Sequence, residues 1–348
     1  MLDLMQDAGP DAVIGYWILD ADGSWVRSLS DSLLWISQAV FPDFLIPYFS
    51  VSNFSFLCAL FLYIEIVQHV EFFHTGHFEK KYHRIIPPAG LRLFIDFFWE
   101  TDFDDLWSIY PKGFSDALFP NTGYTYLINL ANPFIMQVDT RKFEIKVDSF
   151  LPRHKAIECY HRPGNKLFGI KFRVSPVIFE KKINFAEYRD YMFPLSYLID
   201  RAIINKVKLA GSFNERVSIL NSYFQKIIKQ YSGSLREVEM VTAILNHCDR
   251  HNDFSSSIES FAKKYKISTR TLQRYFEKAT SISSKKAIQI MRIRKAAAHI
   301  ARSPQTFHFA DYGYYDHSHF YKHLRQFLQK DTLKNLQPVL KMLHALHQ

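Results

Sequence analysis

The sequence has few cysteines, and they are not arranged for disulfide bonds. Cys58, Cys159 and Cys248 are odd in number, lie far apart and form no CxxC pair. This usage excludes a secreted disulfide scaffold and is typical of a reducing cytoplasm, where we expect the protein to reside. The acidic start of the chain also lacks the basic region that opens a secretory signal peptide.

Motifs for nucleotide binding and catalysis are missing as well. The chain has no GxGxxG, no P-loop and no HExxH. The run Asp316-His-Ser-His319 contains the residue types of a catalytic triad, but four consecutive helical residues splay through nearly a full turn and cannot converge. We therefore expect neither an enzyme nor a cofactor.

The histidines follow no complete pattern of metal ligands. His69, His74 and His77 lie close together, but no Cys or acid stands at a recognised ligand spacing beside them. Two further pairs have the four-residue spacing that can bind zinc on one helix face, but they lack the accompanying Glu or Cys. These pairs are His247 with His251 and His319 with His323. No metal site is expected.

Residues 1–80 form an apolar N-terminal extension whose structure the sequence does not indicate. The uncharged stretch 44–64 is long enough to span a bilayer. However, it contains Pro47 and Asn53, is followed by Glu65 and has no flanking cluster of Lys or Arg. A buried or partner-facing helix is therefore favoured, and a membrane anchor at 44–64 is the alternative.

A helix-turn-helix pattern occurs twice between residues 258 and 330. In the first copy, Ser268 can cap a helix over 269–278, whose Leu272 and Phe276 face inward. The second helix of such a unit enters the DNA major groove, so its outward residues are candidate DNA contacts. These outward residues are Arg270, Gln273 and Arg274.

The second copy has Gly313 in its turn and Asp316 as the cap of a helix over 317–328. A spacer helix is expected over 285–301, between the two copies, because its apolar residues follow helical spacing. The outward residues of the second recognition helix, which we also predict to contact DNA, are His317, Ser318, Tyr321 and Lys322.

The positive charge of the chain is concentrated in this same segment. Residues 258–330 contain fifteen Lys or Arg and four Asp or Glu, a net charge of +11, whereas the whole chain carries +9. A localised positive field is what binding to phosphates requires. A Lys-rich helical face can also be simple solvated surface, but two helix-turn-helix patterns beside it favour double-stranded DNA as the partner.

Three segments resemble the AraC/XylS family of bacterial transcription regulators: Ser268-Thr-Arg-Thr-Leu-Gln-Arg-Tyr-Phe276, Arg292-Ile-Arg-Lys-Ala296 and Phe309-Ala-Asp-Tyr-Gly-Tyr-Tyr-Asp-His-Ser-His-Phe-Tyr-Lys322. The resemblance covers residues 236 to 332. It implies an all-α domain with two helix-turn-helix units, regulation of transcription, chiefly activation, and RNA polymerase as a partner. The chain departs from the family at two glycines and two prolines that follow the recognition helices, which puts the sharpness of those helix ends in question. The departures are Ser281, Gln329, Ser284 and Thr332.

The region before the helix pairs has a different texture. From Tyr82 to Phe172, short apolar runs such as Trp107–Tyr110 alternate with turn residues, which predicts a small antiparallel sheet or partial barrel. Helices are expected at 194–204, 213–231 and 237–251. The region weakly resembles the N-terminal domain of one AraC/XylS subgroup. Four of its aromatic residues could line a ligand pocket, although core packing is the favoured role: Phe98, Trp99, Trp107 and Tyr124.

The predicted fold class is α+β, with a β-rich sensor-like domain at 81–231, a linker at 232–234, a double helix-turn-helix domain at 235–332 and a helical tail at 333–348. The predicted function is sequence-specific transcription regulation. A small effector and a homodimer are left open. The competing hypotheses are a membrane-tethered regulator and an enzyme or adaptor with a nucleic-acid-binding tail.

Overall fold

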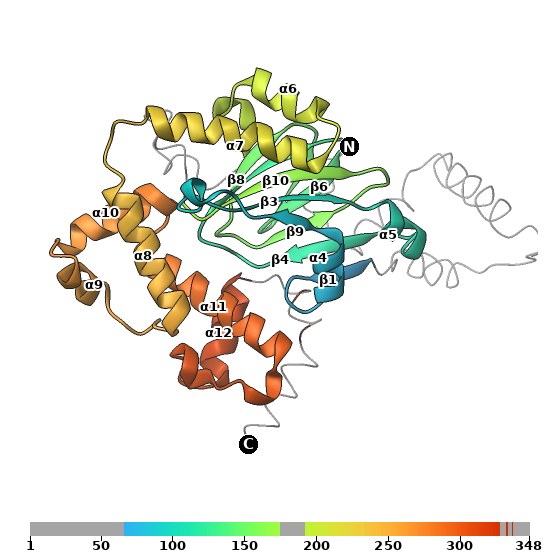
Figure 1. The fold of residues 1–348 in the computed structure, drawn as a ribbon. Helices are drawn as coiled ribbons and strands as arrows, with labels where there is room; N and C mark the ends of the chain where they lie inside the picture. The colour runs from blue at the N-terminus through green and yellow to red at the C-terminus, as the bar shows by residue number, and fades with distance from the viewer. Residues whose placement is uncertain (1–65, 175–191, 328–331, 333–335, 337–348) are drawn as a thin grey trace, which may run out of the picture. The chain divides into compact units, whose positions relative to one another are not determined.

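The computed structural model describes residues 66–174, 192–327, 332 and 336 (Figure 1). All of these residues belong to one unit, which spans residues 65–348. The stretch 44–64, and with it the membrane-anchor hypothesis, lies outside the described residues, as does the tail at 333–348 apart from Leu336. No helix within the described ranges is long and apolar enough to cross a membrane.

Two sheets form the first part of the described chain. The five-stranded sheet has the order β1-β4-β9-β6-β7: β1 (Val67–Val70), β4 (Phe114–Leu118), β9 (Ile157–Tyr160), β6 (Phe134–Val138) and β7 (Arg141–Ile145). The six-stranded sheet has the order β11-β8-β5-β10-β3-β2: β11 (Phe193–Pro194), β8 (Ser149–Pro152), β5 (Tyr124–Asn129), β10 (Lys166–Phe172), β3 (Ile95–Asp102) and β2 (His83–Ile85). Among the described strands, β1 pairs with β4 in parallel, and the other neighbouring strands pair antiparallel.

The six-stranded sheet is buried on both faces. Successive residues of a strand point to opposite faces, and along the central strands both sets of residues are apolar. Leu127 and Leu167 belong to the core that the two sheets share. Their neighbours Tyr126 and Phe168 belong to the core on the opposite face. On that face lie α6 (Arg201–Leu209) and α7 (Phe213–Gln230), as Figure 1 shows. An aromatic contact between Phe168 and Phe213 joins sheet and helix.

The second part of the described chain is helical, as predicted. It contains α8 (Arg236–His251), α9 (Ile258–Lys264), α10 (Thr269–Thr280), α11 (Ser284–Arg302) and α12 (His317–Phe327), with short 3-10 turns at Pro304–Thr306 and Phe309–Tyr312. Both predicted caps are present. The Ser268 hydroxyl accepts from the Thr271 N–H at 3.1 Å, and the Asp316 carboxylate accepts from the His319 N–H at 2.7 Å. The sequence therefore predicted the helices α10 and α12, and their role as recognition helices stays a prediction.

Three details differ from the sequence-based expectations. The helix expected at 194–204 is a 3-10 turn at Leu195–Tyr197 followed by α6, because extended Asp200 caps α6 by accepting from Ala202. The run Trp107–Tyr110 lies at the end of α5 (Asp104–Ile109), where acidic residues in the first turn favour a helix. The sheet also begins before residue 81, because β1 pairs with β4 and α4 (Thr75–Lys81) follows β1.

Ser281 ends α10 in the left-handed conformation, with φ 61° and ψ 9°. This is one of the positions where the AraC/XylS family has glycine. The Ser281 N–H donates to the Glu277 carbonyl at 2.8 Å, so the helix ends sharply without the glycine. Its buried hydroxyl forms a hydrogen bond with the Tyr124 hydroxyl of β5. That contact offsets part of the cost of about 1–2 kcal/mol for an L residue in this conformation.

A substitution at Gly169 of β10 would test how closely the six-stranded sheet is packed. It lies opposite Trp99 of β3, and a Cβ at this position would lie 2.1 Å from the indole. We expect Gly169→Ala to lower the free energy of unfolding by about 1–3 kcal/mol, because the ring must move within a packed core. Urea denaturation measures the change. Gly90→Ala is the matched control, since a Cβ there meets open space; equal stability of the two variants would contradict the packing argument.

Candidate nucleic-acid interface and ligand cavity

Helix α10, which the sequence predicts as the first recognition helix, presents its predicted DNA contacts in two different ways. Arg270 and Arg274 are exposed. Gln273 is half-buried, and its amide oxygen accepts from the Ser284 hydroxyl at 2.6 Å while its amide nitrogen donates to Glu277 at 2.9 Å. Gln273 therefore ties α10 to the start of α11. It must release these bonds before it can contact a base.

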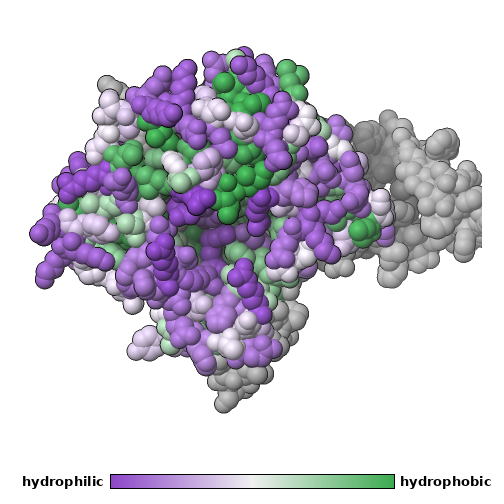
Figure 2. Space-filling model, in the orientation of Figure 1, coloured by the Kyte–Doolittle hydropathy of each residue, from purple (hydrophilic) through white to green (hydrophobic). Residues whose placement is uncertain are grey.

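The second recognition helix brings its four predicted residues together. His317, Ser318, Tyr321 and Lys322 line one open depression on α12, together with Arg325 and Gln326. The His317 ring stacks on Tyr321, with ring centroids 6.1 Å apart, and meets the edge of Phe309. The neighbouring helices α9 and α10 also carry mostly hydrophilic side chains on the face that Figure 2 shows.

Tyr315 is a candidate contact that the sequence did not single out. It immediately precedes the α12 cap and is 97% exposed. Its position in a turn, outside any periodic pattern, carried no signal. An exposed aromatic ring at the start of a recognition helix can contact a sugar or a thymine methyl group.

Spacer helix α11 contacts both recognition helices. Arg292 donates to the Gly313 carbonyl at 3.2 Å, contacts His323 Nδ1 at 2.9 Å and lies over the Tyr314 ring. Burial, and then the Arg292 charge, lower the pKa of His323 to about 4. Gln289 lies 3.3 Å from the other ring nitrogen. Both ring nitrogens of His323 thus face side chains of α11.

Arg294 of α11 connects the helical region to the sheets. It donates to Glu71 at 2.9 Å and to the carbonyls of Phe119 and Pro120 at 3.0 Å each. Burial alone would raise the pKa of Glu71, but Arg294, helped by Arg153 and Lys171, lowers it to about 2. Glu71 follows β1 in a stretch that the sequence left unassigned, and no local pattern indicated its partner.

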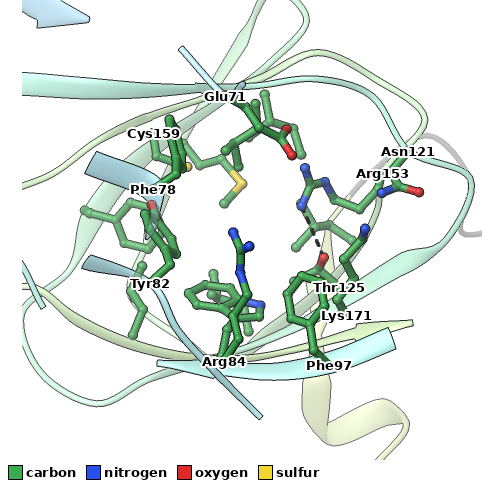
Figure 3. A pocket seen from close by; sticks show the side chains of 18 of the residues that line it. Glu71, Phe78, Tyr82, Arg84, Phe97, Asn121, Thr125, Arg153, Cys159 and Lys171 are labelled. Atoms are coloured by element: carbon green, nitrogen blue, oxygen red, sulfur yellow. Dashed lines mark hydrogen bonds between the residues drawn. The ribbon is translucent and has the colours of Figure 1, made fainter. Parts of the chain in front are cut away.

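A cavity of about 90 Å³ lies within the β-rich region, lined by residues of both sheets (Figure 3). Apolar side chains such as Phe134 and Leu151 form part of its wall. Glu71, Arg84, Arg153 and Lys171 also line it. Burial lowers the pKa of Lys171 to about 8, although Asp96, 3.4 Å away, opposes this shift.

Of the four aromatic residues that could line a pocket, one lines the cavity and the other three lie in core clusters. Trp99 lines the cavity, whereas Phe98 and Tyr124 belong to the core beside the helices. Trp107 packs on the core between the sheets. Core packing thus accounts for three of the four residues, in agreement with the favoured role.

No protein-family model matches the chain, and no curated protein matches it. Solved structures of ToxT from Vibrio cholerae are similar at low TM-scores. A 1.65 Å structure is 10% identical and covers 60% of this chain and 88% of that chain, with a TM-score of 0.34. ToxT bound to (E)-4-(8-methylnaphthalen-1-yl)but-3-enoic acid is 12% identical, with 65% and 92% covered and a TM-score of 0.34. Unsaturated fatty acid bound ToxT is 10% identical, with 60% and 84% covered and a TM-score of 0.34.

The ion pair between Glu71 and Arg294 predicts a pH dependence. A carboxylate whose pKa is lowered from 4.5 to about 2 on folding stabilises the protein above pH 4.5, and this stabilisation is lost as the pH falls towards 2. Between pH 5.5 and 3.5 we expect the wild-type protein to lose about 1 kcal/mol more than Glu71→Gln. Urea unfolding at both pH values gives the comparison. Equal losses would show that Glu71 has no lowered pKa.

Proposed function

We propose that the chain is a sequence-specific DNA-binding regulator of transcription, chiefly an activator, rather than an enzyme. One observation carries the proposal: two capped recognition helices pack on one spacer helix and expose Arg270, Arg274 and Lys322 in a segment of net charge +11. The resemblance of these helices to the AraC/XylS family supports the same function. Double-stranded DNA is the direct partner, and RNA polymerase is the expected partner of an activator.

The length of the spacer helix suits a protein that contacts two segments of the major groove with one chain. Helix α11 contains 19 residues, which at 1.5 Å each gives a length of about 28 Å. Equivalent positions of the major groove on one face of B-DNA lie about 34 Å apart. A modest bend of the DNA reduces the remaining difference. One chain would therefore read two successive groove segments, and because the outward residues of α10 and α12 differ, the site need not be palindromic.

A footprinting experiment tests this arrangement. The full-length protein is used to select a binding site from random duplexes, and footprinting should show two protected patches on one face. Inserting about 5 bp between the patches turns one patch to the opposite face and should remove most of the affinity. The control is the same insertion outside the footprint. Unchanged affinity after the internal insertion, or protection only by a dimer on a palindrome, would refute the two-headed reader.

The cavity favours an amphipathic anion as the effector. Two cationic side chains, Arg153 and Lys171, lie among its apolar walls, and Arg84 reaches it as well (Figure 3). A carboxylate paired with these cations and an apolar tail against the walls would match this lining. At about 90 Å³ the cavity is smaller than the 300–1,000 Å³ of common ligand pockets, so a ligand must displace wall side chains.

Through Glu71, binding of such a ligand can affect the helices that we propose to bind DNA. Its carboxylate lines the cavity and also binds Arg294 of α11. A second carboxylate bound at Arg153 and Lys171 would repel Glu71 and compete for the same positive field. The ligand would thereby weaken the attachment of α11 to the β-rich region and shift its DNA affinity.

Decanoate is a suitable probe, with decanol as the uncharged control. Decanoate should bind and change DNA affinity, whereas decanol should not. Because Lys171 loses its proton as the pH rises through about 8, decanoate affinity should fall by up to about tenfold between pH 7 and 9. Lys171→Met should bind more weakly at pH 7 and lose this dependence. Titration calorimetry measures both, and a pH-independent wild-type affinity would contradict the role of Lys171.

A further inference from the structure

A buried carboxylate surrounded by three imidazoles lies apart from the DNA-binding helices. Asp116 of β4 has no exposed surface. Its Oδ1 lies 2.8 Å from His77 Nε2 and 3.7 Å from His69 Nδ1, and its Oδ2 lies 3.3 Å from His161 Nε2. The histidines come from three places, β1, α4 and the turn after β9. The ring nitrogens of His69 and His77 and the Asp116 oxygen lie within 4.8 Å of one another.

The contacts of the three imidazoles with Asp116 lack good hydrogen-bond geometry. His69 Nδ1, His77 Nε2, His161 Nε2 and Asp116 Oδ1 are all buried and have no hydrogen-bond partner among the described residues. The Tyr82 hydroxyl donates to Asp116 Oδ2, so that oxygen is satisfied while Oδ1 is not. Buried polar atoms without partners are costly, and a group of them converging on one point indicates a missing ligand.

The hydrogen bonds of His161 favour a lone pair on its inner nitrogen. His161 Nδ1 lies 3.0 Å from the Asn165 side-chain oxygen, and Asn165 donates through its Nδ2 to the Asn132 carbonyl. This orientation of the amide places the proton of neutral His161 on Nδ1. The lone pair of Nε2 then points towards the carboxylate, which is unfavourable unless a cation lies between them. A hydrogen bond that fixes the outer nitrogen is common in metal-binding histidines.

The stacking of His69 and His77 argues against a positive charge on both rings at once. They are stacked with centroids 3.9 Å apart and an interplanar angle of 5°. Two positive charges at that separation repel each other in a buried site.

We propose that His69, His77, His161 and Asp116 bind a divalent transition-metal ion, with Zn²⁺ the favoured species. Imidazole nitrogen and carboxylate oxygen are common zinc ligands, with bonds of about 2.0–2.2 Å in tetrahedral geometry. The donor atoms of His69, His77 and Asp116 already lie within 4.8 Å of one another, and His161 approaches the other Asp116 oxygen at 3.3 Å. Mg²⁺ and Ca²⁺ are disfavoured because they prefer sites made of oxygen ligands.

The metal would fasten the start of the described chain to the sheets. His69 and His77 lie on either side of Glu71, while Asp116 and His161 belong to the five-stranded sheet and the turn that follows β9. Binding would therefore hold the segment 67–81 in place. All four residues belong to the β-rich region, so metal binding there does not require DNA binding.

Zinc binding by the full-length protein provides the test. After removal of metal with a chelator, we expect the wild-type chain to bind Zn²⁺ at this site with a Kd below about 1 µM. His77→Ala should lose this binding, whereas His83→Ala, which removes an exposed histidine nearby, should retain it. Titration calorimetry measures affinity, and mass spectrometry of the metal content measures stoichiometry. Equal zinc binding by the two variants would overturn the proposal.

Wild-type protein supplies a second readout that requires no buried substitution. Co²⁺ at this site should give the visible absorption bands of a four-coordinate ion with nitrogen and oxygen ligands, and Zn²⁺ should displace it. The thermal midpoint should rise with Zn²⁺ but not with Mg²⁺. Absence of both the Co²⁺ bands and the Zn²⁺-dependent rise would overturn the proposal, whatever the folding state of His77→Ala.

Discussion

The contact between Arg294 and Glu71 links the two parts of the described chain. One guanidinium binds a carboxylate and two backbone carbonyls, so its donors are used in a fixed planar arrangement. Arg294 also lies over the Phe72 ring at 4.9 Å. The contact combines charge, hydrogen bonds and a cation–π interaction in a mostly buried place, where the loss of one partner leaves an uncompensated charge. Together with the Tyr124–Ser281 hydrogen bond, it joins the helical part to the sheets.

The helical part was readable from the sequence because its signals are local. Capping residues such as Ser268 and Asp316 stand directly before the helices they begin, and Leu272 and Phe276 show the inward face within one turn and a half. The strands were recognised as β structure, but their order was not predictable. Pairing Val67 with Phe114 depends on contacts 47 positions apart, which short apolar runs do not encode.

The candidate sites show the same division. Outward residues of α12 were predicted and lie in one depression, whereas Gln273 of α10 was predicted to face DNA and also binds Ser284 and Glu277. A helix pattern gives the direction of a side chain but not its competing partners. The histidine cluster escaped detection because Asp116 lies 39 positions after His77, so no ligand spacing was visible.

The parallel pairing of β1 with β4 has a consequence for the order of folding. During synthesis β1 leaves the ribosome before β4, and β4 is itself paired with the later β9. Closing such a long loop costs entropy that the short strand β1 cannot recover alone. We therefore expect β1 to join the sheet late, after the antiparallel strands have formed. The chain would reach its functional form only when its earliest described segment has been captured by much later ones.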